Sequence, residues 1–210
     1  MKVLAILSQK GGTGKTTLAV NLSVEAARRM GGGVALIDLD PQVSATRWGD
    51  ARSSGAPVVI SCQASRLEHH LDGFRKDRFN WVVIDTAPHS ETAALNAARQ
   101  ADLILIPCRP AIFDLRAIAA TIEIAEVAKV PAFAVLNAVP PRGGLADEAA
   151  EAICGYGVPL APVRISQRSA LIHSLTYSQA VSEFEPRGKG NLELVRLYDW
   201  VSERLGGEDS

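Results

Sequence analysis

The chain has little net charge and no long hydrophobic run. Its 22 Lys and Arg residues against 23 Asp and Glu residues give a formal charge of −1. No global basic field therefore attracts nucleic acid, and any such contact needs a local patch. No apolar run approaches the ~18 residues of a membrane span, and Met1 leads into a strand-like segment without a signal-type hydrophobic region. From these absences we expect a soluble, cytoplasmic protein with no membrane association.

Cysteines are scarce. The three present, Cys62, Cys108 and Cys154, are odd in number, lie far apart and lack the paired spacing of a metal site. This argues against a disulfide framework and indicates reduced thiols, each a small core residue. The 210 residues contain no internal repeat, low-complexity linker or clear domain boundary. We expect one domain over residues 1–210, large enough to bury a sizeable core.

Short β-branched runs alternate along the chain with longer alanine-rich stretches of helical period. Runs that are apolar throughout are typical of parallel strands with both faces covered. The pattern predicts an α/β fold with one doubly wound, mostly parallel sheet and helices on both faces. The predicted strands are 2–8, 34–39, 57–61, 81–86, 102–108 and 131–137. The predicted helices are 15–30, 43–53, 65–72, 90–100, 113–128, 145–155 and 190–205, and the segment 162–190 is the least regular.

The stretch SQKGGTGKTT (8–17) joins the first predicted strand to the first predicted helix. It departs from the phosphate-loop pattern G-x-x-x-x-G-K-[ST] only in its first position, which is Gln9. Its glycines allow backbone N–H groups to face phosphate oxygens, and the helix N-terminus adds a partial positive charge. Lys15 is predicted to reach the β/γ-phosphates of a nucleotide and Thr16 to hold Mg²⁺. The loop residues predicted to bind the nucleotide are Gly11, Gly12, Thr13, Gly14, Lys15, Thr16 and Thr17.

Carboxylates follow two of the predicted strands. Asp85 ends the run 81–86 as a Walker-B aspartate would, and it is predicted to hold the Mg²⁺ shell directly or through water. Asp38 and Asp40 end the run 34–39, and alternate residues of an extended chain point to the same side. Carboxylates close to a triphosphate are electrostatically costly unless a metal or a water needs them. We assign Asp40 to orienting or deprotonating the attacking water and Asp38 to the metal surroundings.

Three motifs in this order resemble the deviant Walker-A ATPases of the ParA/MinD family: K-G-G-T-G-K-T-T (10–17), D-L-D-P-Q (38–42) and V-V-I-D-T-A-P (82–88). The resemblance covers essentially the whole chain. It implies an ATPase with ATP or ADP and Mg²⁺ as cofactors, weakly active unless stimulated. In the family, the lysine that matches Lys10 crosses a dimer interface to contact the nucleotide of the other subunit. By this resemblance, Lys10 binds nucleotide, takes part in catalysis and makes dimerisation the readout of nucleotide state.

Two further segments are similar to small ParA- or ParF-type partition ATPases. They are LILIPCRPAIFDLRAI (103–118) and the tail 164–190, which has a Q-R pair, a V-x-E and an E-P-R-G-K. This resemblance implies an ATP-bound homodimer that binds DNA nonspecifically. A ParB-like or cargo-adaptor protein would stimulate hydrolysis and so drive segregation of a plasmid, a chromosome or another cargo. Asn137 matches a position near the adenine base in relatives, although Ala138 follows where many relatives have arginine.

A MinD-like membrane-associated ATPase is the first alternative. Its relatives use a basic amphipathic C-terminal helix, which binds anionic lipid. The end of this chain has a plausible apolar stripe at Leu192, Val195, Trp200, Val201 and Leu205. The chain closes on Glu208, Asp209 and Ser210, however, which is the wrong charge for lipid. The stripe is more simply a core-facing one.

Two enzymatic alternatives share the same loop. An iron protein of the nitrogenase type needs cysteines that bridge a cluster between subunits. Cys108 and Cys154 do not fall at the positions that this resemblance would require. An ATP-dependent biosynthetic enzyme on the same fold stays open, although F-D-L-R-A-I (113–118) and the tail argue against it.

DNA contact is predicted from local basic residues. Those near the presumed dimer edge are Arg142, Arg164, Arg168, Arg187 and Lys189. A few phosphate contacts per subunit suffice if a dimer doubles them, and such binding is sequence-blind and salt-dependent. Arg164 and Arg168 are the best candidates, because a short helix would place both on one face. The protein is then expected to be nucleoid-associated.

Replacement of Lys10 by alanine tests the cross-subunit role. The variant should still bind ATP as a monomer, because Lys15 and the loop amides remain. With ATP it should stay monomeric by light scattering, whereas the wild type should become a dimer. Lys76→Ala, outside the motifs, serves as the control. A normal ATP-dependent dimer of Lys10→Ala would show that the role is wrong.

Overall fold

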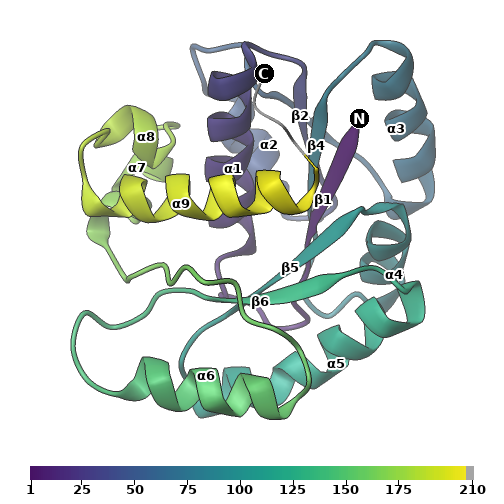
Figure 1. The fold of residues 1–210 in the computed structure, drawn as a ribbon. Coiled ribbons are helices and arrows are strands. Elements are labelled where there is room, and N and C mark those ends of the chain that lie inside the picture. The colour runs from purple at the N-terminus through teal and green to yellow at the C-terminus, as the bar shows by residue number, and fades with distance from the viewer. Residues whose placement is uncertain (207–210) are drawn as a thin grey trace.

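The computed structural model describes residues 1–206, apart from the side chains of 112–116. One six-stranded sheet forms its centre, and all neighbouring strands run parallel in the order β3-β2-β4-β1-β5-β6 (Figure 1). The strands are β1 (Lys2–Ile6), β2 (Val34–Asp38), β3 (Val58–Ser61), β4 (Trp81–Asp85), β5 (Leu103–Cys108) and β6 (Ala132–Leu136). The predicted fold class is therefore confirmed.

Helices cover both faces of the sheet, because the strands are apolar on both sides. Every residue of β2, β4 and β5 is buried. Successive strand residues point to opposite faces, so Leu4 and Ile6 of β1 contribute to one core and Val3 and Ala5 to the other. The first core is closed by α1 (Lys15–Met30), α2 (Ser44–Asp50), α7 (Ser169–Thr176), α8 (Val181–Phe184) and α9 (Lys189–Arg204). The second core is closed by α3 (Leu67–Lys76), α4 (Glu91–Gln100), α5 (Ile112–Ala128) and α6 (Leu145–Gly155), with the 3₁₀ turn η1 (Ala64–Arg66) before α3.

Most predicted elements are found, with small shifts at their ends. The helices predicted over 15–30 and 145–155 have these bounds in the structure. Strand β1 ends at Ile6, two residues earlier than predicted, although the N–H of Leu7 still donates to the carbonyl oxygen of Leu105 in β5 at 2.9 Å. The segment 162–190, described above as irregular, holds the short helices α7 and α8. The F-D-L side chains at 113–115 lie outside the described residues.

The C-terminal helix α9 packs across α1 (Figure 1), and its apolar face differs from the predicted one. The buried positions are Leu194, Leu197, Tyr198, Val201 and Leu205. Their spacing of three and four residues keeps them on one face, and Leu192 falls outside it with 50% exposure. The core-facing orientation is confirmed for Val201 and Leu205 and for Trp200, which packs half-buried against the first core, whereas the membership of Leu192 is wrong. The acidic residues 208–209 lie outside the described part, and no helix within 1–206 is long and apolar enough to cross a membrane.

Candidate nucleotide-binding site

The phosphate loop leaves the carboxyl end of β1 at the centre of the sheet, between β4 and β5, and enters α1. Ligands of open parallel sheets bind at this edge, where the strand order reverses. Gly12 and Gly14 have φ angles of 76° and 94°, in the left-handed region that favours glycine. A Cβ at Gly14 would lie 2.1 Å from Nδ2 of Asn137. Glycine at this position therefore lets the loop close onto the residue that follows β6.

Lys15 begins α1 and folds back over the loop. Its side chain is largely buried, and its Nζ donates a hydrogen bond to the carbonyl oxygen of Lys10 at 3.3 Å. Burial lowers the pKa of Lys15, while the nearby charges of Asp85 and Asp40 oppose this shift. A partly desolvated ammonium over a loop of N–H donors is suited to phosphate oxygens, which restore the charge compensation that water no longer supplies.

Thr16 and Asp85 meet beside this lysine. The Thr16 hydroxyl donates a hydrogen bond of 2.6 Å to Oδ2 of Asp85. Asp85 is only 1% exposed, and its Oδ1 has no hydrogen-bond partner among the described residues. Burial raises the pKa of Asp85 to about 7; Asp38 and Asp40 add to this shift, while Thr16 and Lys15 oppose it. A buried carboxylate oxygen without a partner, next to a hydroxyl, fits a hard cation such as Mg²⁺.

The donor set also agrees with the way Mg²⁺ is held. Among the described residues, no group of three or more His, Cys, Asp or Glu side chains could hold a metal alone. Mg²⁺ keeps several waters and is usually bound by one or two side chains together with substrate phosphates. Thr16 and Asp85 are residues of this kind, so the site fits a magnesium–nucleotide complex better than a metal held by the protein alone.

Asp38 lies beside Asp85 on the neighbouring strand, but its carboxylate is turned toward α2. Its side chain is buried, and Oδ1 accepts the backbone N–H of Asp40 at 3.0 Å. Oδ2 accepts the backbone N–H of Thr46 at 3.0 Å and the Thr46 hydroxyl at 3.2 Å. These bonds shape the loop after β2 and anchor α2. The predicted place of Asp38 in the metal surroundings stays a prediction.

Asp40 and Lys10 occupy the more open side of the site. Asp40 lies two residues beyond the end of β2, is partly exposed, and accepts the N–H of Gln42 through Oδ1 at 2.9 Å. Its charge acts on Lys15. Lys10 is half-buried at the loop, and its ammonium forms no ion pair with any residue that the structure describes. Both side chains can therefore meet groups that come from outside the subunit.

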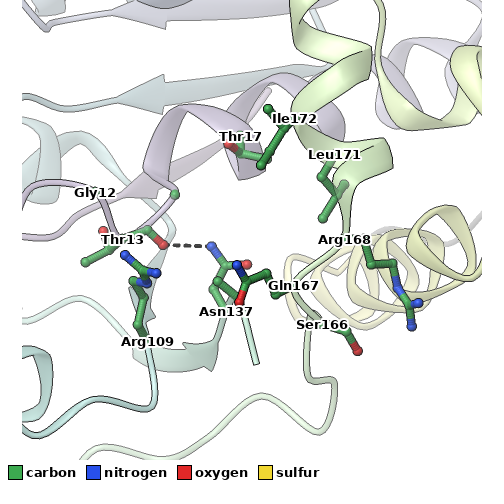
Figure 2. A pocket seen from close by; sticks show the side chains of 12 residues that line it. Gly12, Thr13, Thr17, Arg109, Asn137, Ser166, Gln167, Arg168, Leu171 and Ile172 are labelled. Carbon is green, nitrogen blue, oxygen red and sulfur yellow. Dashed lines mark hydrogen bonds between the residues drawn. The ribbon is translucent and has the colours of Figure 1, made fainter. Parts of the chain in front are cut away.

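A pocket of about 220 Å³ extends from the phosphate loop toward the C-terminal segment (Figure 2). The buried amide of Asn137 donates a hydrogen bond to the carbonyl oxygen of Thr13 at 2.7 Å and so fixes the floor of the pocket. Figure 2 shows Leu171 and Ile172 of α7 on the opposite side. The lining residues are Gly12, Thr13, Gly14, Thr17, Arg109, Asn137, Ala138, Ser166, Gln167, Arg168, Leu171 and Ile172. The pocket has the position that the nucleoside of a loop-bound nucleotide requires.

Several lining residues were not predicted. Arg109 directly follows β5, so the rule that parallel strands end at one edge could have found it. Gln167, Leu171 and Ile172 carry no such signal, because Gln167 reaches the pocket through its backbone bond to Val139 and the other two through the packing of α7. Asn137, for which the resemblance implied a position near the adenine base, contacts the phosphate loop in the structure, and its contact with a base stays a prediction.

The structure corrects the geometry expected of Arg164 and Arg168. They do not share a helix: α7 starts at Ser169, and the preceding residues bridge to the loop after β6 through Val139 and Ser166. Hydrogen bonds from Val139 N to Ile165 O and from Gln167 N to Val139 O keep this segment extended. Arg164 pairs with Asp147 at 2.8 Å, and Arg168 pairs with Glu193. Both guanidinium groups therefore already have carboxylate partners.

The comparisons with known proteins agree with this geometry. Residues 4–181 match the model of the CobQ/CobB/MinD/ParA nucleotide binding domain. The chain belongs to this family. The ParA/MinD membership that the three motifs predicted is thereby confirmed.

Relatives extend over nearly the whole chain. "Maintenance of carboxysome distribution protein A" of Gloeobacter kilaueensis is 34% identical over 209 residues, which cover 97% of this chain and 94% of that protein. "Chromosome-partitioning ATPase Soj" of Thermus thermophilus is 26% identical over 240 residues, 96% of either chain. The septum site-determining protein MinD of Pyrococcus horikoshii, solved with Mg-ADP, has the same fold, with a TM-score of 0.77, 20% identity and coverage of 100% of this chain and 98% of that one.

Replacement of Asp85 by asparagine should stabilise the nucleotide-free protein and abolish Mg²⁺-dependent ATP binding. The folded pKa of about 7 lies above the ordinary value of 3.8, so this carboxyl group contributes less stability as the pH rises through that range. Asp85→Asn should raise the free energy of unfolding at both pH values, and this increase should be about 3 kcal/mol larger at pH 8 than at pH 5. Urea unfolding at the two pH values measures it, with exposed Asp77→Asn as the control. A gain that does not change with pH would contradict this account of Asp85.

Proposed function

We propose that the chain is a positioning ATPase that dimerises around ATP and distributes a large cargo within the cell. The observation that carries the proposal is the meeting of Lys15, Thr16 and Asp85 at the end of β1 and β4. The family membership of the chain and the pocket beside these residues support ATP, with Mg²⁺, as the ligand. Relatives named for carboxysome distribution and for chromosome partitioning support positioning as the cellular role.

The chemistry assigned to each residue follows from its surroundings. The loop amides and Lys15 bind and orient the β/γ-phosphates. Thr16 and Asp85 would hold Mg²⁺, which neutralises charge on the phosphate oxygens when it is bound. Asp40, partly exposed on the open side, orients the attacking water and accepts its proton. Phosphoryl transfer needs mainly such positioning and charge compensation.

Lys10 supports the dimer. Its ammonium lacks an ion-pair partner within the described part of its own subunit, and the loop that carries it lies at the surface with Gly11 and Gly12 exposed. A second subunit facing this loop would bring a triphosphate within reach. Hydrolysis then removes the charge that Lys10 compensates, and a partner protein that speeds hydrolysis resets the dimer to monomers.

Nonspecific DNA is the proposed track on which the dimer moves its cargo. Arg164 and Arg168 already form ion pairs, so the DNA contact is assigned to other basic residues of the same region. Arg187 and Lys189 are exposed and line one hollow that also contains Pro141, the neighbour of Arg142. The selectivity for one cargo is assigned to a ParB-like or other adaptor protein.

Replacement of Asp40 by alanine should slow ATP turnover by about a hundredfold, the lower end of the effect of a positioned general base. ATP affinity should stay the same or rise slightly, because the carboxylate repels the triphosphate in the ground state. Single-turnover hydrolysis and calorimetry measure the two quantities. Asp50→Ala, an exposed carboxylate at the end of α2, is the matched control, and in Lys15→Ala the ATP affinity should fall sharply. Wild-type turnover in Asp40→Ala would remove this residue from the mechanism and leave Asp38 as the next candidate.

A binding assay separates the DNA track from a membrane track. ATP-loaded protein should shift random duplex DNA, ADP-loaded protein should not, and binding should weaken steeply with salt because phosphate contacts release counterions. The double variant Arg187→Ala/Lys189→Ala should weaken the shift without loss of ATP hydrolysis. Anionic liposomes should recruit little protein in either state. Recruitment to liposomes without any DNA shift would instead support a MinD-like role.

A further inference from the structure

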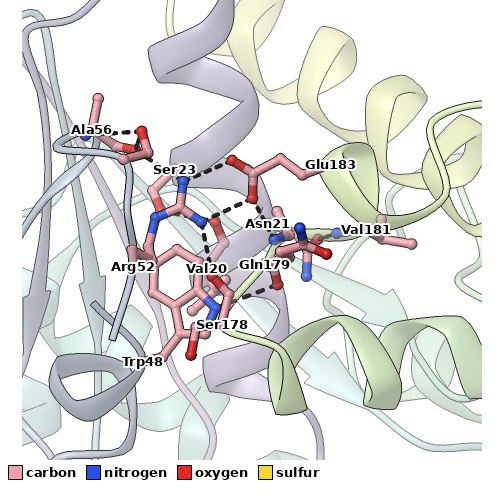
Figure 3. A network of polar contacts seen from close by, with 12 residues as sticks. Val20, Asn21, Ser23, Trp48, Arg52, Ala56, Ser178, Gln179, Val181 and Glu183 are labelled. Carbon is pink, nitrogen blue, oxygen red and sulfur yellow. Dashed lines mark hydrogen bonds and ion pairs between the residues drawn. The ribbon is translucent and has the colours of Figure 1, made fainter. Parts of the chain in front are cut away.

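A polar network outside the phosphate loop joins the C-terminal segment to α1 and α2 (Figure 3). At its centre, Arg52 follows α2 and donates hydrogen bonds of 2.7 and 2.8 Å to the two carboxylate oxygens of Glu183 in α8. The Arg52 side chain is 3% exposed and its guanidinium lies 4.4 Å above the ring of Trp48. A bidentate pair with one partner this deeply buried is directional and costly to break.

The same guanidinium holds two backbone segments. It donates to the carbonyl oxygen of Ser178, between α7 and α8, at 3.3 Å, and to that of Ala56 at 3.2 Å. Glu183 in turn accepts the backbone N–H of Ala180 at 2.7 Å. Burial alone would raise the pKa of Glu183, but the bonds from Arg52 and Ala180 lower it, so this group stays ionised. The pair therefore fixes the turn into α8 as well as the ion pair itself.

Two further side chains hold the turn between α7 and α8. The indole N–H of Trp48 in α2 donates to the carbonyl oxygen of Gln179 at 3.3 Å. Asn21 of α1 accepts the N–H of Val181 at 2.8 Å and donates to the carbonyl oxygen of Thr17 at 2.8 Å. Thr17 belongs to the pocket lining. The turn after α7 is thus tied both to the helix that follows the phosphate loop and to α2.

The helix that this network holds forms one wall of the nucleotide pocket. Leu171 and Ile172 of α7 face the phosphate loop across the pocket, and Ile172 is 66% exposed. Leu171 is buried in the first core and Glu193 holds the residues before α7, so the turn that follows α7 adds the anchorage at the other end of the helix, next to the exposed Ile172. The phosphate loop, by contrast, is built from its own backbone and from Asn137. Damage to the network should move the nucleoside wall and leave the phosphate cradle intact.

We propose that Arg52 and Glu183 are positioning residues that hold α7 as the nucleoside wall of the pocket, so that they set the affinity for the nucleoside part of ATP and not for its triphosphate. The inference rests on the proposed function, since it requires ATP as the ligand. Neither residue touches the phosphate loop, yet the proposal gives both a role in holding the nucleoside.

The test compares ATP with inorganic tripolyphosphate on the full chain by calorimetry. Arg52→Lys keeps the charge but loses the two-pronged geometry, and Glu183→Gln keeps the shape but loses the charge. Each should lower the affinity for ATP by about tenfold, the factor that corresponds to roughly 1.4 kcal/mol, with tripolyphosphate affinity unchanged. The double variant should be no weaker than the weaker single one, because both substitutions break one contact. Arg75→Lys, in the exposed pair with Asp72, is the matched control and should change neither affinity.

Trp48→Phe provides a milder variant that keeps an aromatic ring under Arg52 and removes the bond to Gln179. It should show the same selective loss of ATP affinity, smaller in size, with thermal melting used to verify that all variants are folded. An equal loss for both ligands, or no loss for either, would overturn the proposal while the wild type still bound ATP. A wild type that bound neither ligand would contradict the proposed function itself, and the inference with it.

Discussion

The carboxylate of Asp85 is buried where almost no water reaches it. It ends the central strand β4 with 1% exposure, one oxygen on the Thr16 hydroxyl and the other without a partner among the described residues. Such a group is unfavourable when ionised unless a cation compensates it. Lys15 compensates only in part, as the raised pKa of Asp85 shows. The site is therefore organised for a ligand that brings positive charge with it, which a magnesium–nucleotide complex does.

The sheet explains why these groups meet. β1 lies between β4 and β5, and Ile6 at the end of β1 is in register with Asp85 at the end of β4. All strands run parallel, so the residues that follow them gather at one edge. The loop after β1, Asp85, Arg109 after β5 and Asn137 after β6 are thus brought together without any of them being close in the sequence. The close approach of Asn137 to Gly14 is the tightest of these meetings and requires that glycine.

The C-terminal segment adds what the sheet edge lacks. The edge carries the residues proposed to contact phosphate and metal, whereas the outer wall of the pocket comes from α7. This helix is held by Glu193 of α9 through Ser166 and Arg168 on one side and by the Arg52–Glu183 network on the other. The ion pairs of this region therefore flank the helix that lines the pocket. Arg168 pairs with Glu193 in this arrangement, although an arginine is equally suited to bind a nucleic-acid phosphate.

The sequence by itself determined the parts of the protein that are local in the chain. The phosphate loop is one contiguous segment, so its glycines, Lys15 and Thr16 could be placed from their spacing. Asp85 could be placed because parallel strands end at a common edge. Only the tertiary structure decided where α7 lies, which face of α9 is buried and which arginines are already paired. Arg52 and Glu183 are 131 positions apart, and no period or motif links them. Contacts of this kind depend on how whole helices pack. Shape and burial determine which distant residue a side chain meets, and the residues next to it in the sequence do not indicate that partner.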